Sequence, residues 1–250
     1  VHDYDHATRE GGPEHARTSG KMVAIYALES LKSGSETLET VPLGFRAREL
    51  YLEVENRGYH IALVSQLFDR PYYFVDTNLP LGPGNLPVLK TQEVVVDIGP
   101  AELLTIPGEM HAELLLATPD GKTAVDAPYP FTPPPYLVLN DPTHNPNCGT
   151  DGHSRCDDGP PAIDLLDKTK VIDLGRDPRA TYRWVIGLGQ DETGYVVPAY
   201  DYKLDPGHPY LNEAAPGDHY EETNSVGPNV EAQVCDPLRQ LLRSAPVVAR

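Results

Sequence analysis

The sequence has 250 residues, of which 40% are hydrophobic and 23% charged, a balance that is ordinary for a globular protein. Its formal net charge of −17 repels phosphate backbones and anionic membrane surfaces, so nucleic acid is not an expected partner. No apolar run approaches the roughly 18 residues that cross a bilayer, so no transmembrane segment is expected. The 26 prolines and 21 glycines predict short elements joined by ordered loops.

The first part of the chain predicts a helix, a strand, a second helix and a long connection. Apolar residues recur at helical spacing over residues 21–32, and residues 45–55 alternate as a half-buried strand does. Residues 59–68 are apolar enough for a packed helix. Residues 76–91 are rich in proline and glycine, which is typical of a loop over a site or surface.

The central stretch predicts a hairpin followed by a helix. Residues 92–98 contain a β-branched run, and residues 101–106 are expected to form the returning strand. A Pro-Gly pair then stops this strand, and a helix is expected over residues 109–117, with Glu109 in its first turn. An acidic side chain there has two interpretations: a functional carboxylate at a strand exit, or a solvated residue favoured by the helix dipole.

The rest of the chain predicts an insertion, a strand and a closing helix. Residues 117–181 are poor in hydrophobic residues and are expected to form a loop-rich insertion. Its acidic stretch, residues 151–158, is expected to be a solvated loop, with calcium binding as an alternative. A strand is expected over 182–189 and a helix over 229–243. These elements predict a single domain of the α/β or α+β class, with a central mixed sheet between helices.

The three cysteines bear on the cellular compartment. Cys148 and Cys156 are separated by a polar loop that a disulfide could close, which leaves Cys235 over. The bridge would favour an extracytoplasmic or secreted protein. A zinc site with His144 and His153 is the competing interpretation, although no CxxC motif supports it.

Three stretches stand out in order along the chain: IPGE (106–109), VIGLGQDETGYVVP (185–198) and HYEETNSVGP (219–228). Together they resemble the neutral/alkaline, non-lysosomal ceramidase family of zinc-dependent amide hydrolases. The chain departs from the family pattern in two respects. Glu109 and Tyr195 are farther apart than is usual in the family, because the cysteine-bearing insertion lies between them, and Gln190 stands where asparagine is common.

The resemblance implies a role for each matching residue. Glu109 corresponds to a carboxylate ligand of Zn²⁺, Tyr195 to a phenolate ligand, and Tyr220 to the catalytic tyrosine that contacts the reacting carbonyl. Further residues of the same motifs are expected to bind substrate: Gln190, Asp191, Glu221 and Asn224.

The resemblance covers only the C-terminal half of the family's catalytic domain. The family's two histidine ligands belong to an N-terminal half that nothing in this sequence matches. We therefore expect a partner, either that half as a separately processed chain or a second subunit. The expected function is hydrolysis of the amide bond of a lipid-like N-acyl substrate or a related small amide. An esterase or lactonase on the same scaffold, and a non-catalytic binding or scaffold subunit, are the alternatives.

Overall fold

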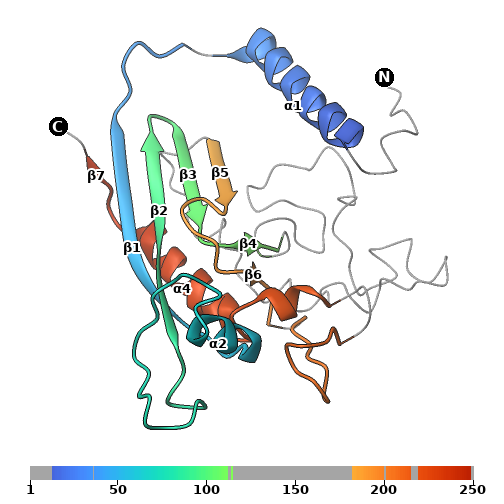
Figure 1. The fold of residues 1–250 in the computed structure, drawn as a ribbon. Coiled ribbons are helices and arrows are strands. Elements are labelled where there is room, and N and C mark those ends of the chain that lie inside the picture. Colours follow the sequence, from blue (N-terminus) through green and yellow to red (C-terminus); the bar gives the residue numbers. More distant parts are fainter. Residues whose placement is uncertain are drawn as a thin grey trace, which may run out of the picture. The chain divides into compact units, whose positions relative to one another are not determined.

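The computed structural model describes residues 13–35, 37–111, 114, 182–199, 201–214 and 219–248 (Figure 1). The chain divides into two compact units, Val1–Val41 and Pro42–Arg250. In the first unit, helix α1 spans Pro13–Gly34. It contains the predicted helix over residues 21–32 and begins earlier. Among the described residues, no helix is long and apolar enough to cross a membrane.

The second unit is built on a mixed sheet, which confirms the predicted α/β class. Its strands are β1 (Leu43–Glu53), β2 (Val88–Ile98), β3 (Ala101–Ile106), β5 (Tyr182–Gly187) and β7 (Val247–Val248). They lie in the order β5-β3-β2-β1-β7. The β3–β5 pair is parallel and the other pairs are antiparallel. The sequence did not decide between these arrangements, because β3 and β5 are joined through a long segment rather than a tight turn.

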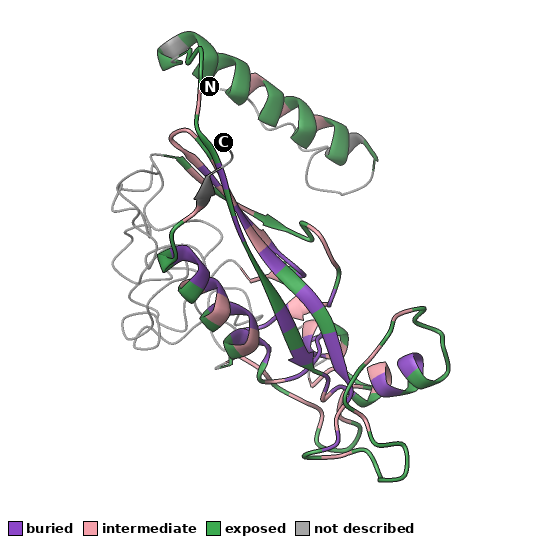
Figure 2. Ribbon diagram, turned by 90° about the vertical axis from the view of Figure 1, so that its left-hand side faces the viewer, coloured by how far each residue is buried: buried purple, intermediate pink, exposed green. Residues whose placement is uncertain are grey.

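Helix α4 (Val230–Arg243) packs against β1 and β2 and covers one face of the sheet (Figure 2). Its core side is fully apolar except for Glu231, and Val234, Cys235 and Leu238 are completely buried. The helix continues through Pro237, although an interior proline removes a backbone hydrogen bond. Burial of this apolar side against the sheet offsets that loss. The second helix, α2, spans Arg57–Val64, a shorter helix than the predicted 59–68.

A buried ionic network ties the strands to the end of α4. The Arg46 guanidinium donates to Glu102 at 2.6 Å and to Asp97 at 2.7 Å, and Arg183 donates to Glu102 at 2.5 Å. Arg46 also donates to the carbonyls of Leu242 and Ser244. The guanidinium therefore satisfies carbonyls at the C-terminal end of the helix while it neutralises carboxylates that the sheet buries.

The predicted helix over residues 109–117 is wrong where the structure describes it. Glu109–Met110 form a short strand, β4, which pairs with β6 (Tyr195–Val196) in a separate two-stranded parallel sheet. The Glu109 N–H donates to the Gly194 carbonyl, and the His111 N–H donates to the Val196 carbonyl. These distant partners override the local helical pattern, which included no information about them.

The predicted insertion, residues 117–181, lies entirely outside the described residues. Three hypotheses about it therefore stay predictions: the Cys148–Cys156 bridge, the alternative zinc ligands His144 and His153, and calcium binding at residues 151–158.

Candidate functional site

The candidate site lies where the two parallel strands of the main sheet end. Strand β3 leads through Pro107 and Gly108 into β4, and β5 leads through a loop into β6. The register of the β4–β6 ladder places Glu109 directly opposite Tyr195. Two residues that belong to separate motifs in the sequence are therefore neighbours at one edge of the fold.

Two glycines allow these backbones to approach so closely. A Cβ atom on Gly108 would lie 2.3 Å from the Gly194 carbonyl oxygen, and a Cβ on Gly194 would lie 2.1 Å from the Asn224 carbonyl oxygen. Gly194 also has a positive φ of 97°, a conformation that other residues adopt at a cost. Thr193 fixes the approach, because its hydroxyl donates to the Pro107 carbonyl at 2.6 Å. The P-G-E and T-G-Y sequences thus have a steric explanation.

Tyr220 joins Tyr195 from a third segment of the chain. Their hydroxyl oxygens are 2.6 Å apart, and their rings meet edge to face with centroids 5.4 Å apart. The hydrogen bond with Tyr220 raises the pKa of Tyr195 well above its usual value, and loss of hydration and the Glu109 carboxylate act in the same direction. The phenol of Tyr195 is therefore firmly protonated when only these side chains surround it.

His111 is a further neighbour of Tyr195. The sequence places it close to Glu109, but in an expected helix. Its ring packs edge to face on Tyr195 with centroids 6.4 Å apart. Glu109 and His111 are two positions apart in an extended segment, so their side chains lie on the same side of it. An E-x-H pattern would have indicated this pairing if the segment had been interpreted as a strand.

The segment that carries Tyr220 is held by buried polar groups. His219 Nδ1 lies 2.8 Å from the Glu222 carboxylate, and both side chains are buried. Glu222 also accepts from the Lys203 N–H at 3.0 Å. Burial raises the pKa of the nearby Asp201 to about 6, although His219 and Lys203 oppose the rise. The side chain of Asp201 therefore titrates close to neutral pH, beside the segment that presents Tyr220.

Asn56 also holds the segment that carries Tyr220 in place, and the sequence analysis does not identify it. Its side-chain oxygen caps α2 by accepting from the N–H groups of Gly58 and Tyr59. Its amide nitrogen donates to the carbonyls of Thr223 and Ser225 at 2.9 and 2.8 Å. The asparagine after a strand was a visible helix N-cap signal, but its second pair of partners is distant in sequence.

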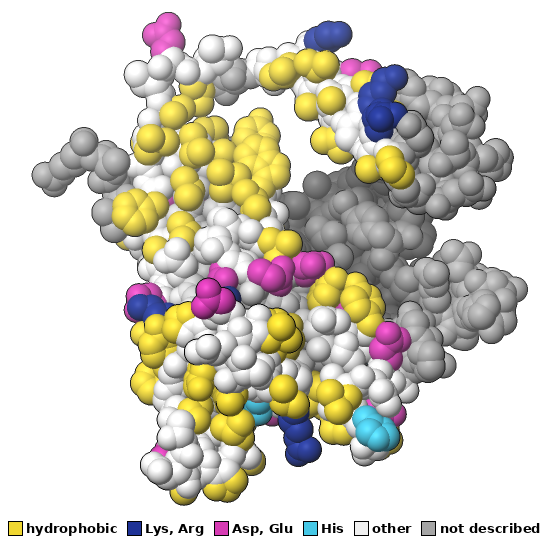
Figure 3. All heavy atoms as spheres, in the orientation of Figure 1, with side chains coloured by type: hydrophobic (Ala, Val, Ile, Leu, Met, Phe, Trp, Pro, Cys, Tyr) yellow, Lys and Arg dark blue, Asp and Glu magenta, His cyan; other side chains and the backbone are white. Residues whose placement is uncertain are grey.

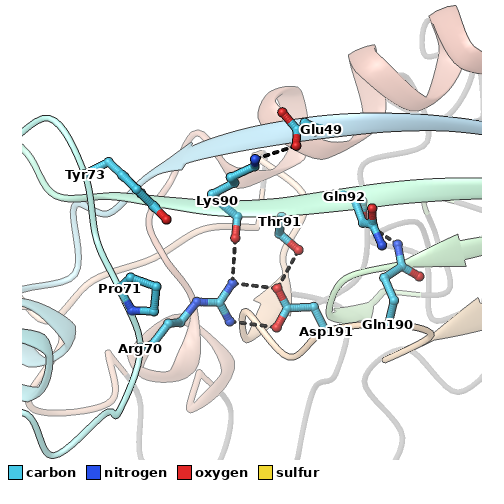
Figure 4. A pocket seen from close by; sticks show the side chains of 9 residues that line it. All are labelled: Glu49, Arg70, Pro71, Tyr73, Lys90, Thr91, Gln92, Gln190 and Asp191. Atoms are coloured by element: carbon cyan, nitrogen blue, oxygen red, sulfur yellow. Dashed lines mark hydrogen bonds and ion pairs between the residues drawn. The ribbon is translucent and has the colours of Figure 1, made fainter.

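Two predicted substrate-binding residues, Gln190 and Asp191, line a cavity of about 430 Å³. Figure 4 shows the Arg70 guanidinium directly against the Asp191 carboxylate in the lining of this cavity. The guanidinium binds both carboxylate oxygens, at 2.7 and 2.5 Å, and Thr91 donates to the same carboxylate at 2.5 Å. Gln190 donates to the Gln92 carbonyl. These contacts attach the loop before Tyr195 to strand β2.

The other two predicted substrate-binding residues lie next to Tyr220. Glu221 and Asn224 begin and end the short 3₁₀ helix η4 (Glu221–Asn224). The Asn224 amide donates to the Tyr220 carbonyl at 3.1 Å, and its own carbonyl contacts Gly194. Asn224 thus helps to shape the turn, and substrate binding by these residues stays a prediction.

The donor set fits part of a zinc site. Glu109 and Tyr195 bring a carboxylate and a phenol to paired positions of one ladder, and a carboxylate is a common oxygen ligand of zinc. The described residues contain no cluster of three or more His, Cys, Asp or Glu side chains that could hold a metal ion. A complete site would therefore need ligands besides these.

No family model, curated protein or solved structure matches this chain. The chemistry of the site consequently rests on its own geometry.

Proposed function

We propose that this chain contributes Glu109, Tyr195 and Tyr220 to a zinc-dependent hydrolase that cleaves the amide bond of a lipid-like N-acyl substrate or a related amide. The observation that supports this function is the convergence of the three residues. Glu109 pairs with Tyr195 across a parallel ladder, and the Tyr195 and Tyr220 hydroxyls are 2.6 Å apart. Each residue comes from a different one of the three motifs that resemble ceramidases.

Each side chain has a definite task in this proposal. Glu109 supplies a negatively charged oxygen ligand, and Tyr195 supplies a second oxygen once its phenol loses the proton. Zinc, when bound, provides Lewis acidity and activates water at neutral pH. Tyr220, 41% exposed, donates a hydrogen bond to the developing oxyanion, a contribution of about 3 kcal/mol for comparable donors.

The proposal includes a partner. Two imidazole ligands come from outside this chain, from an N-terminal half that was processed into a separate chain or from a second subunit. We also propose an extracytoplasmic location, which depends on the Cys148–Cys156 bridge. An esterase or lactonase would use the same residues, since an ester and an amide present the same carbonyl.

A non-catalytic binding subunit is the second candidate function. The hydrogen bond between the Tyr195 and Tyr220 hydroxyls, 2.6 Å apart, favours it, because this bond partners both phenols within the chain without a metal. The two candidates differ in what the complete assembly contains and does.

The test uses the complete assembly, with zinc content and hydrolysis of a fluorogenic N-acyl amide as readouts. Glu109→Gln should keep the fold and lose activity by orders of magnitude. Tyr195→Phe should weaken zinc retention, whereas Tyr220→Phe should lower kcat with zinc still bound. Tyr182→Phe, an exposed tyrosine of β5, is the matched control. Stoichiometric zinc that resists a chelator in this chain alone would refute the shared site, and full activity of Glu109→Gln would favour the binding subunit.

A further inference from the structure

Part of the sheet face opposite α4 is a continuous apolar surface, which we call the open face; farther along β1 and β2 the same side carries the Glu49–Lys90 ion pair. The register aligns three rows of residues across four strands. The rows are Leu43, Ile98, Ala101 and Tyr182; Phe45, Val96, Leu103 and Trp184; and Ala47, Val94, Thr105 and Ile186. None of these twelve side chains is charged. Figure 3 shows apolar side chains gathered over this part of β1, β2, β3 and β5.

Large parts of this surface are exposed. Phe45, Tyr182 and Trp184 keep 52%, 54% and 53% of their surface accessible. Leu43, Ile98 and Ile186 are exposed as well. A large side chain has about 200 Å² of surface to bury, and these six are each roughly one-third to one-half exposed, so together they expose roughly 600 Å². This area is at the upper end of the largest apolar patch on a typical monomer.

The strand sequences also indicate burial on both faces. Strand β2 carries the run Val94-Val95-Val96, in which Val95 is completely buried toward α4. A half-solvated antiparallel strand would place polar residues at the alternate positions. Val94 and Val96 instead point to the open face, and the same holds for Leu103 on β3. A sheet of this composition normally lies between two covering layers.

We propose that a second copy of this chain covers the open face, so that two sheets pack face to face in a twofold dimer. Sheets that pack this way keep their strand directions within about 30° of one another and stand about 10 Å apart. Two copies would bury about 1,200 Å² in all, the lower limit of a standard stable interface. Each chain carries a net charge of −17, so charged faces of two copies would repel each other. The open face has no charged side chain, which permits two copies to pack there.

This inference is independent of the proposed hydrolase activity. Glu109 and Tyr195 belong to the separate β4–β6 ladder and are not among the twelve residues. Dimerisation through the open face therefore does not require the candidate site, and either proposal can fail without the other.

The only tryptophan of the chain, Trp184, lies in the middle row and serves as a built-in probe. The full 250-residue chain is studied from about 0.1 to 100 µM by sedimentation velocity and by fluorescence. The dimer should have twice the 27.4 kDa mass of one chain. Dilution should produce monomer, with a red shift of the Trp184 emission that follows the loss of dimer. Added salt should strengthen the dimer, because it screens repulsion between the copies.

Two variants with the same added charge separate the open face from the rest of the surface. Phe45→Glu should raise the dimer dissociation constant at least tenfold while leaving Trp184 in place as the probe. Ile61→Glu, at a 67% exposed position of α2, should leave it unchanged; circular dichroism checks that both variants fold. A monomer at every concentration overturns the proposal, whatever its Trp184 emission: exposed emission means an uncovered face, and buried emission means a cover from the same chain. Equal effects of the two variants also overturn it.

Discussion

Glu109 and Tyr195 lie directly opposite each other in the parallel ladder of β4 and β6. The ladder is only two residues long, so its own hydrogen bonds contribute little to holding the pair. Gly108 and Gly194 hold it instead, because their backbones meet where a side chain would not fit. The geometry of the candidate site should therefore depend on glycines that take no part in its chemistry.

Gly194→Ala is expected to destabilise the protein by at least about 2 kcal/mol, because the new Cβ meets the Asn224 carbonyl and the positive φ is strained. Urea unfolding measures the loss. The matched control is Gly82→Ala, where a Cβ has no heavy atom within 4 Å and little change is expected. Equal stability of Gly194→Ala and the wild type would contradict the close backbone approach.

The Arg70–Asp191 ion pair should stabilise the loop before Tyr195. Burial alone would raise the pKa of Asp191, but hydrogen bonds from Arg70 and Thr91 outweigh it and lower the pKa below 3.8. The contribution is therefore complete above the ordinary pKa and is lost as the pH falls through the lower, folded-state value. Both side chains are about one-quarter exposed, so the expected contribution is modest, about 1 kcal/mol.

Asp191→Asn tests this contribution by urea unfolding at pH 7 and at pH 3. The variant should be less stable than the wild type at pH 7, and the difference should shrink at pH 3, because the unfolded chain takes up a proton on Asp191 below the ordinary pKa of 3.8. Asp236→Asn breaks the more exposed pair with Arg239 and should change stability by less than about 0.5 kcal/mol. A loss that is the same at both pH values would argue against the ion pair.

Sequence reasoning predicted most of the main sheet and missed the contacts that build the site. Strand β3 has the bounds that the sequence predicts, 101–106, because a Gly-Pro break before it and a Pro-Gly stop after it mark both of its ends. Residues 109–111 were assigned to a helix, because their partners in β6 are distant in sequence and leave no local pattern. Arg70 and Asn56 were missed for the same reason.

The residues of the candidate site also divide into those that the sequence identifies and those that it does not. Glu109, Tyr195 and Tyr220 were selected from short motifs, and the structure brings them together. Their motifs contain glycines whose spacing reflects close backbone contact, and such a requirement is visible in a sequence. The edge-to-face contact of His111 with Tyr195 depends instead on the strand geometry of residues 109–111, which the helix prediction obscured.

Glu93 should make the protein less stable as the pH rises. Its carboxylate is completely buried, and neither oxygen has a hydrogen-bond partner among the residues that the structure describes. Burial raises its pKa from 4.5 to about 8, although Arg48 on β1 opposes the rise. The folded protein thus keeps a proton that the unfolded chain releases above about pH 4.5, so folding loses up to about 1.4 kcal/mol per pH unit between these values.

Glu93→Gln should remove this pH dependence, because the amide is neutral throughout. Measured at pH 5, 6.5 and 8, the unfolding free energy of the variant should increase relative to that of the wild type as the pH rises. The control is Glu53→Gln, an exposed carboxylate of β1, whose difference from the wild type should not grow with pH. Parallel profiles for Glu93→Gln and the wild type would show that Glu93 is not protonated in the folded protein.

Cys235 should not react with thiol reagents in the native protein. It is a free cysteine on the core side of α4 and is completely buried. Burial also raises the pKa of its thiol far above the usual value, and the thiolate is the reactive form. Iodoacetamide without reductant should therefore leave Cys235 unmodified, and the same reagent in urea should alkylate it.

Peptide mapping of the alkylated protein tests the predicted disulfide in the same experiment. If Cys148 and Cys156 are bridged, urea without reductant should expose one reactive thiol, that of Cys235, and a reductant should expose all three cysteines. Alkylation of Cys148 and Cys156 before reduction would refute the bridge and remove its support for an extracytoplasmic location. Rapid alkylation of Cys235 in the native protein would show that α4 does not stay packed on the sheet.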